Sequence, residues 1–428
     1  MPHPAEVSAE SMVLSTHPES TSDRRGLSAP AGNGGLLTDV EWDSMSNRIG
    51  PGRFPGIRSP LKSLVWLVRV IVGVVFLIGL LATLAAVPGL SLLTLGFMLA
   101  AEAGLARSGS LRHAFPLLPV STRIGTILIL VGLFLLPLRL LASLAAAHGV
   151  IAQSSPLAPN PQHTVLVVLQ VLVFVHMITA IACGGSLACF VRPIRNIRRL
   201  AIGLRDGSWK ESLNHWSTWL LSVFRPCEHL VLAVKATVGA VIWLFIPTAL
   251  LAASSRPQTD PGFPGLLSFV GGILLIPVAS WLPLLQVHQA VTGRFRDIFD
   301  VRTVRRIIRQ VPVHWAIAAV LLYAAAIPLY LTKVRLIADD AVWLLTPLFV
   351  ILIYPARLMF GWVYARGMRR PDPTTRLIRW PVKLVMIPVL GAYALILFAT
   401  PLISEAGQAA LFENHAFLLP IPGQLFGS

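Results

Sequence analysis

Charged residues are scarce in this chain, at 13% of its 428 residues, with 19 acidic against 35 basic side chains. An average soluble domain carries about 25% charged residues. Together with 55% apolar residues and a mean hydropathy of +0.73, this scarcity excludes an ordinary soluble enzyme. Cysteine is also rare: the chain has only Cys183, Cys189 and Cys227. No two of them form a Cys-x-x-Cys pair. The sequence therefore supports neither a disulfide framework nor a cysteine-based metal site.

Motifs of catalysis are missing as well. The sequence has no His-Glu-x-x-His helix, no Gly-x-Ser-x-Gly elbow and no phosphate-binding Gly-x-x-x-x-Gly-Lys-[Ser/Thr] loop. We therefore predict a protein that is not an enzyme, without catalytic residues, cofactors or bound metal. The net charge of +16 would suggest nucleic acid in a soluble chain. Here the excess positive charge lies mainly in the connections between apolar runs, where the orientation of a membrane protein explains it. We therefore predict no nucleic-acid partner.

Long apolar runs, by contrast, are abundant. Runs of about 18 or more mostly apolar residues are long enough to form transmembrane helices. The sequence has nine, at 64–86, 89–106, 124–147, 163–190, 229–253, 265–289, 313–332, 341–361 and 381–404. We predict an all-α polytopic membrane protein with nine transmembrane helices, or eight if 89–106 is a re-entrant segment.

If the apolar runs cross the membrane in alternating directions, the basic residues of the connections lie almost entirely on one side. With the N-terminus in the cytoplasm, most of the 35 Lys and Arg residues lie in or beside cytoplasmic connections. Only Arg256, Lys333 and Arg335 fall in connections on the other side. The positive-inside rule therefore predicts a cytoplasmic N-terminus and an external C-terminus.

The regions outside the apolar runs have distinct compositions. Residues 1–60 are rich in Ser, Pro, Gly and charge without a sustained period, which predicts a disordered cytoplasmic tail. Residues 61–404 form the predicted transmembrane domain, and 405–428, which lack basic residues, form a predicted external tail. The basic cytoplasmic elbows are expected at 107–123, 192–228, 290–312 and 362–380.

Two of these elbows show the period of an amphipathic helix. In 290–312 the apolar positions Val301, Val304, Ile307, Ile308 and Val311 lie opposite Arg302, Arg305, Arg306 and Arg309. In 192–228 the apolar positions Ile194, Ile197, Ala201 and Leu204 lie opposite Arg195, Arg198, Arg199 and Arg205. Such helices lie in the membrane interface, apolar side toward acyl chains and guanidinium groups toward phosphates. We expect them to engage anionic lipids of the bilayer or partner membrane proteins; the alternative is helices that only set orientation.

Three polar residues lie at depth within the predicted spans. Arg139 and Gln170 are about equally far from the outer ends of their spans, and His176 lies near the middle of its span. Ionisable residues at depth are costly and usually functional. One interpretation is that Arg139, Gln170 and His176 line a cavity or proton path of a transporter or pore for a small solute. The other is that Arg139 reaches outward to water and His176 donates a hydrogen bond in helix packing.

Further polar and helix-breaking residues occur near the predicted cytoplasmic ends. Glu102 lies about one turn from the membrane edge, within expected reach of Arg107 or water. Arg357 lies within about two turns of the same edge and is expected to snorkel. Pro277 and Pro283 free backbone carbonyls in 265–289, which neighbouring helices must satisfy unless the carbonyls line a water-filled site.

A short motif occurs twice. Residues 106–115 and 290–299 share the pattern A-x-[ST]-G-x-[LF]-R-x-x-F, and each copy directly follows a predicted span that runs toward the cytoplasm. We interpret this as a repeated unit of helix, basic elbow and helix, whose two copies run parallel.

Two segments resemble a known family. Gln289–Pro312, with the sequence QAVTGRFRDIFDVRTVRRIIRQVP, is similar to the cytoplasmic elbow of an uncharacterised prokaryotic family of polytopic membrane proteins. Gly96–Phe115, with the sequence GFMLAAEAGLARSGSLRHAF, resembles an earlier motif of the same family, which would extend the resemblance over about residues 65–335. The resemblance implies a multi-pass protein of a prokaryotic cytoplasmic membrane and supplies no catalytic residues.

Overall fold

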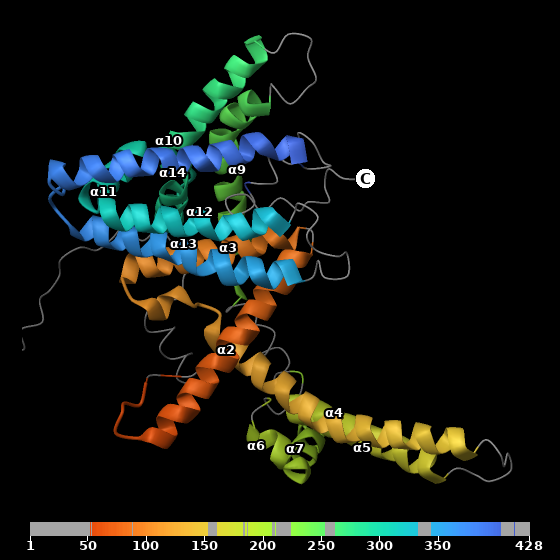
Figure 1. Ribbon diagram of the computed structural model, residues 1–428. Coiled ribbons are helices and arrows are strands. Elements are labelled where there is room, and N and C mark those ends of the chain that lie inside the picture. Colours follow the sequence, from red (N-terminus) through yellow and green to blue (C-terminus); the bar gives the residue numbers. More distant parts are fainter. Residues whose placement is uncertain are drawn as a thin grey trace, which may run out of the picture. The chain divides into compact units, whose positions relative to one another are not determined.

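The computed structural model describes residues 52, 54–87, 89–152, 161–182, 185, 187–207, 210, 224–252, 262–332, 344–403 and 415. All its regular elements in these residues are helical (Figure 1). The α-helices are α2 Pro60–Ala86, α3 Leu90–Ser108, α4 Leu118–Ala152, α5 Pro161–Ala182, α6 Leu187–Val191, α7 Pro193–Arg205, α9 Pro226–Leu251, α10 Gly262–Thr292, α11 Val301–Gln310, α12 Pro312–Thr332, α13 Leu345–Arg369 and α14 Arg376–Ile403. Two 3₁₀ helices, η1 Leu111–Ala114 and η3 Phe295–Phe299, precede α4 and α11. Most of residues 1–60 and of 405–428 lie outside the described residues, so the two predicted tails stay predictions.

The helices confirm the predicted class of a polytopic membrane protein. Among the described residues, eight helices are long and apolar enough to cross a membrane, and the pair α11 and α12, bent by 108°, makes nine if it counts as one span. The segment 89–106, the uncertain crossing in the sequence, corresponds to α3, one continuous helix of 19 residues that begins at Leu90. The uncertainty in the number of spans therefore belongs to α11 and α12.

Helix α3 is the most buried helix of the bundle. Every residue from Leu93 to Ala106 is buried, by contacts with α2, α9, α10 and α13 (Figure 1). Small residues permit this close packing, as they commonly do between membrane helices. A Cβ at Gly361 of α13 would lie 2.5 Å from the backbone oxygen of Glu102, so only glycine fits there.

The two copies of the repeated motif have the same local structure. Gly109 and Gly293 end α3 and α10 in the left-handed region, at φ 68° and 73°, which glycine adopts without strain. Each donates its N–H to the carbonyl four residues earlier, at 2.7 and 2.8 Å. Each is then followed by a 3₁₀ helix, η1 or η3. The local structure thus supports the interpretation that the motif is a repeated unit.

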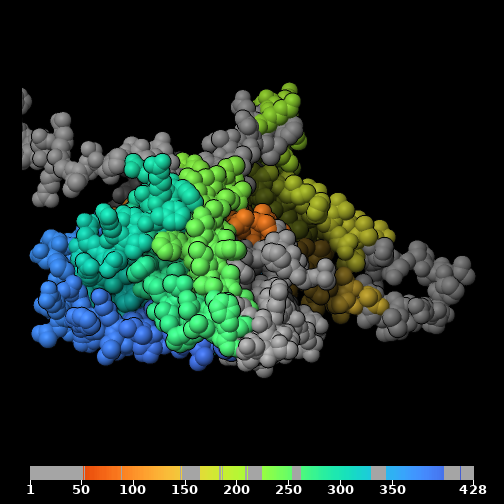
Figure 2. Space-filling view, turned by 90° about the horizontal axis from the view of Figure 1, so that it is seen from above, coloured from red at the N-terminus to blue at the C-terminus, as the bar shows by residue number. Residues whose placement is uncertain are grey.

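The carbonyl freed by Pro283 is satisfied by a neighbouring helix. Proline lacks the N–H that would bind the carbonyl four residues earlier, here that of Ala279. Tyr323 of α12 donates its hydroxyl to this oxygen at 2.7 Å, and Trp315 donates its indole N–H to Ser280 at 3.2 Å. At Pro283 the freed carbonyl is therefore satisfied by a neighbouring helix, as the first of the two alternatives requires, and does not line a water-filled site. Figure 2 shows the green α9 and α10 next to the teal α11 and α12.

The fourth predicted span is shorter than its apolar run. We expected it to continue through residue 190, but α5 ends at Ala182 and two shorter helices, α6 and α7, follow. Gly185 lies between α5 and α6 in the left-handed region, at φ 62°. Such a residue cannot continue a right-handed helix, so the chain turns there in spite of its apolar composition.

Candidate functional site

The apolar side of α11 is packed into the protein. Val304, Ile307 and Val311 are completely buried, in one core cluster with Phe360 and Val363 of α13. We had expected this side to face acyl chains, and for α11 that expectation is wrong. The amphipathic period was recognised correctly, but burial against a neighbouring helix and burial in lipid produce the same pattern in a sequence.

Both ends of α11 are anchored by hydrogen bonds. At its N-terminus the Asp300 carboxylate accepts from the backbone N–H of Thr303 at 3.1 Å and from its hydroxyl at 2.6 Å. At its C-terminus Gln310 donates its amide to the Arg370 carbonyl at 2.6 Å, and Thr374 donates its hydroxyl to the Gln310 carbonyl at 2.7 Å. A helix of ten residues is marginal by itself. These anchors and the buried side hold it in one position.

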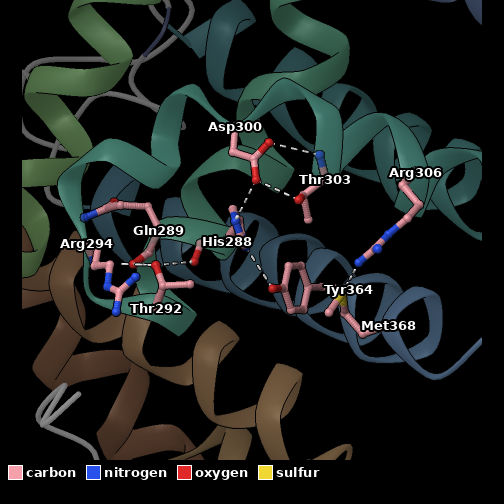
Figure 3. Close-up of polar contacts among 9 residues, drawn as sticks. All are labelled: His288, Gln289, Thr292, Arg294, Asp300, Thr303, Arg306, Tyr364 and Met368. Atoms are coloured by element: carbon pink, nitrogen blue, oxygen red, sulfur yellow. Dashed lines mark hydrogen bonds and ion pairs between the residues drawn. The ribbon is translucent and has the colours of Figure 1, made fainter. Parts of the chain in front are cut away.

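A network of three side chains lies beneath the N-terminus of α11. Figure 3 shows His288 of α10 between Asp300 and Tyr364 of α13. His288 Nδ1 lies 2.8 Å from the Tyr364 hydroxyl, and His288 Nε2 lies 3.6 Å from Asp300 Oδ2. The hydrogen bonds from Thr303 lower the pKa of Asp300, which keeps it ionised as the helix cap. His288 and Tyr364 are buried and Asp300 is partly exposed, so this network joins α10, α13 and the start of α11.

The opposite side of α11 carries an exposed row of guanidinium groups. Arg302, Arg305, Arg306 and Arg309 are all exposed, and within the described ranges none of them forms an ion pair. Arg306 contacts Met368 of α13, with 3.8 Å between Nη2 and Sδ. We call these four residues the α11 arginine row. Four cations on a helix that is fixed on its other side give this part of the surface a high positive charge.

Helix α7 presents its two faces differently. Its Arg195, Arg198 and Arg199 are exposed, as in the α11 arginine row. Ile194 and Ile197 are exposed too, at 83% and 51%, so the apolar side of α7 is not covered by protein. The helix packs on α5, and Asn196, which is buried, donates its amide to the Cys189 carbonyl. Helix α7 therefore has an apolar side and a cationic side that are both exposed, and its expected contact with acyl chains stays a prediction.

The polar residues predicted at depth are not joined by hydrogen bonds within the described residues. Arg139 and Gln170 are exposed on α4 and α5, and among the described residues no hydrogen bond joins them to each other or to His176. The Nε2 atom of His176 lies 2.9 Å from the Phe190 carbonyl of α6. This contact corresponds to the alternative in which His176 serves helix packing. The cavity or proton path stays an untested prediction.

A buried ionic cluster was missed in the sequence. Arg357 donates its Nε–H to Glu102, and its Nη2 donates to Gln286 Oε1 at 3.2 Å. All three side chains are buried, so Arg357 does not snorkel, and Glu102 binds Arg357 instead of Arg107. A signal was present, because Glu102 and Gln286 stand at equivalent positions, four residues before the two copies of the repeated motif. Nothing in the sequence indicated that Arg357 on α13 would be their partner.

One further buried polar side chain has no partner. Gln289 is completely buried, and neither its Oε1 nor its Nε2 forms a hydrogen bond with any residue that the structure describes. It belongs to the same turns of α10 as Gln286 and His288. Within the described part of the chain, no cluster of three or more His, Cys, Asp or Glu side chains could hold a metal ion.

Comparison with known proteins identifies part of the chain. No curated protein and no solved structure matches it. Residues 223–338 match the model of a family described as Protein of unknown function (DUF4013). This match confirms the resemblance seen in Gln289–Pro312 and does not reach Gly96–Phe115. The chain is a polytopic helical membrane protein whose residues 223–338, which supply α9 to α12, carry a domain of unknown function, DUF4013.

Proposed function

We propose that this protein is a non-catalytic component of a prokaryotic cytoplasmic membrane that binds anionic lipid headgroups. The observation that carries the proposal is the α11 arginine row, four exposed guanidinium groups on a helix that is anchored at both ends and along its apolar side. Arginine binds phosphate through a planar fork of donors. A fixed helix loses little conformational freedom when it binds, which favours affinity.

Helix α7 would supply a second, shallower contact. Its exposed Ile194 and Ile197 enter the acyl-chain boundary, while Arg195, Arg198 and Arg199 meet the phosphates. In the proposed orientation both helices lie on the cytoplasmic side, where anionic lipids give a negative surface potential. Each basic residue near such a surface contributes about 1 kcal/mol.

The test compares two lipids with identical acyl chains, phosphatidylglycerol and phosphatidylcholine, added to the detergent-purified full chain. Thermal unfolding is measured for the wild type and for a variant in which Arg302, Arg305, Arg306 and Arg309 are replaced by Gln. Phosphatidylglycerol should raise the Tm of the wild type more than phosphatidylcholine does. The Gln variant should lose most of this difference while its Tm without added lipid stays close to that of the wild type.

A matched variant separates charge from geometry. Replacing the same four residues by Lys keeps the charge and removes the planar fork, so an intermediate response to phosphatidylglycerol is expected. Salt at about 1 M, where the Debye length is about 3 Å, should reduce the response of both cationic proteins. A Gln variant that responds to phosphatidylglycerol like the wild type would refute the proposal for α11.

A further inference from the structure

His415 lies beyond the end of α14 at Ile403, yet it is completely buried in the helix bundle. Its Nε2 lies 3.1 Å from the Thr248 hydroxyl of α9, and its Nδ1 lies 3.0 Å from the Tyr393 hydroxyl of α14. Both partners are buried as well. One imidazole ring therefore connects two membrane helices through both of its nitrogens.

The surroundings hold the Tyr393 ring in place. Its centroid lies 4.6 Å from that of Tyr323 on α12, and the Tyr323 hydroxyl donates to the Ala279 carbonyl of α10 at 2.7 Å. The Tyr323 hydroxyl thus binds a carbonyl of α10, whereas the Tyr393 hydroxyl contacts the His415 ring. The two tyrosines stand in contact but hydrogen-bond to different partners.

The two hydroxyls suit a neutral imidazole. Such a ring has one nitrogen that donates and one that accepts, and a hydroxyl can do either. Thr248 and Tyr393 can therefore satisfy both nitrogens in either tautomer. An aliphatic side chain at this place would satisfy neither hydroxyl, and buried unsatisfied groups are disfavoured.

A cavity lies next to the helix turns that carry the two hydroxyls. A cavity of about 430 Å³ is lined by residues of α9, α10 and α14. Its lining includes Leu251, one turn after Thr248, and Ala394, next to Tyr393. Thr248, Tyr393 and His415 do not line this cavity, so the place that an imidazole ring would take is the one that the His415 side chain itself occupies.

We infer that Thr248 and Tyr393 form an intramembrane binding site for a neutral imidazole ring, and that His415 is its built-in ligand. By occupying this site, His415 latches the C-terminal region of the chain to α9 and α14. The inference is independent of the proposed binding of lipids, because none of its residues belongs to α7 or α11.

The first experiment vacates the site in the full chain with His415→Gly. Free imidazole, at a pH where it is neutral, should raise the Tm of this variant saturably, by about 2 °C or more. The wild type should not respond, because its site is filled, and His415→Gly/Tyr393→Phe should respond much less. 1-Methylimidazole, which has no N–H, should be a weaker ligand. Equal responses of the wild type and His415→Gly to imidazole, or no response of a folded His415→Gly, would overturn the inference.

The second experiment avoids the glycine variant, in case that variant does not fold. Chymotrypsin cleavage after Phe412 or Phe417 is followed in Tyr393→Phe and in Tyr323→Phe, which lose one buried hydroxyl each and keep their rings. Tyr393→Phe should be cleaved about fivefold faster than the wild type, since it loses one of the two hydrogen bonds of the latch. Tyr323→Phe should be cleaved at the wild-type rate. Equal rates in the two variants would show that His415 is not held by Tyr393.

Discussion

Glu102 of α3 and Gln286 of α10 accept hydrogen bonds from the same guanidinium group, that of Arg357 in α13. The two residues stand at equivalent positions of the repeated motif, and the helices that carry them end at the equivalent glycines Gly109 and Gly293. The two copies thus converge on one arginine in the interior of the bundle. This arrangement gives a physical reason for one copy to carry a carboxylate and the other a neutral amide, because a single cation needs one counter-charge.

Removal of the counter-charge should destabilise the protein strongly. Glu102→Leu leaves the Arg357 cation buried without its carboxylate, and losing one partner of a buried pair costs about 3–5 kcal/mol. Glu102→Gln, which copies the residue of the other repeat, keeps a hydrogen-bond acceptor and should have a smaller effect. Thermal unfolding in detergent measures both. If Glu102→Leu/Arg357→Leu is no more stable than Glu102→Leu, the two residues are not coupled.

The unpartnered Gln289 predicts a stabilising substitution. Its amide is buried without a hydrogen bond to the described part of the chain, and the equivalent residue of the first repeat is Leu105, which is buried in an apolar cluster. Gln289→Leu should therefore raise the free energy of unfolding by about 1–3 kcal/mol. Gln286→Leu, three residues earlier, should lower it because Arg357 loses an acceptor. A Gln289→Leu protein less stable than the wild type would indicate that the amide has a bound partner.

Truncation of the apolar side should destabilise the protein at α11 and have almost no effect at α7. Ile307→Ala in α11 removes packing from the core and should cost about 2–5 kcal/mol. Ile197→Ala in α7, where the side chain is 51% exposed, should change the stability in detergent by less than about 0.5 kcal/mol. The comparison uses one substitution at two isoleucines, so the difference in Tm reports burial alone. Similar losses at both positions would mean that α7 is covered by protein after all.

The helix cap at Asp300 should make stability depend on pH in a defined direction. Its pKa is lowered by the hydrogen bonds from Thr303, so the stabilisation is present above the unfolded-state pKa of about 3.9 and is lost as pH falls through the lower folded-state value. Asp300→Ala should lower the Tm above about pH 5, by the equivalent of about 1 kcal/mol. The difference from the wild type should shrink on further acidification. Thr303→Val, which keeps the backbone donor, should show part of the effect.

The position of the C-terminus distinguishes nine crossings from eight. An odd number places the two ends of the chain on opposite sides of the membrane, and the positive-inside rule places the basic connections in the cytoplasm. Alkaline phosphatase fused after Ser428 should then be active outside the cytoplasmic membrane, and a fluorescent protein fused there should be dark. The opposite result would indicate eight crossings, with the bent pair α11 and α12 on one side.

The sequence did not show whether an apolar side chain is buried against protein or against lipid. The nine apolar runs correspond to described helices, because each run is long enough and continuous enough to be recognised by itself. The buried or exposed state of one side of α7 or α11 was not recognisable, because a side chain packed against protein and one packed against lipid are equally apolar. The helix break at Gly185 was missed for a related reason, since its flanks are as apolar as the span.

By itself, the sequence determined the class of the protein, the position of nearly every membrane helix and the repeated elbow. Each of these depends on the hydropathy or the glycines of one short stretch of the chain. Only the tertiary structure decided the contacts between distant residues. It paired Glu102 with Arg357, buried one side of α11 while leaving that of α7 open, and placed His415 between Thr248 and Tyr393. The physical reason is that a buried polar group is satisfied by whichever helix packs against it, and helix packing depends on the shape of both surfaces.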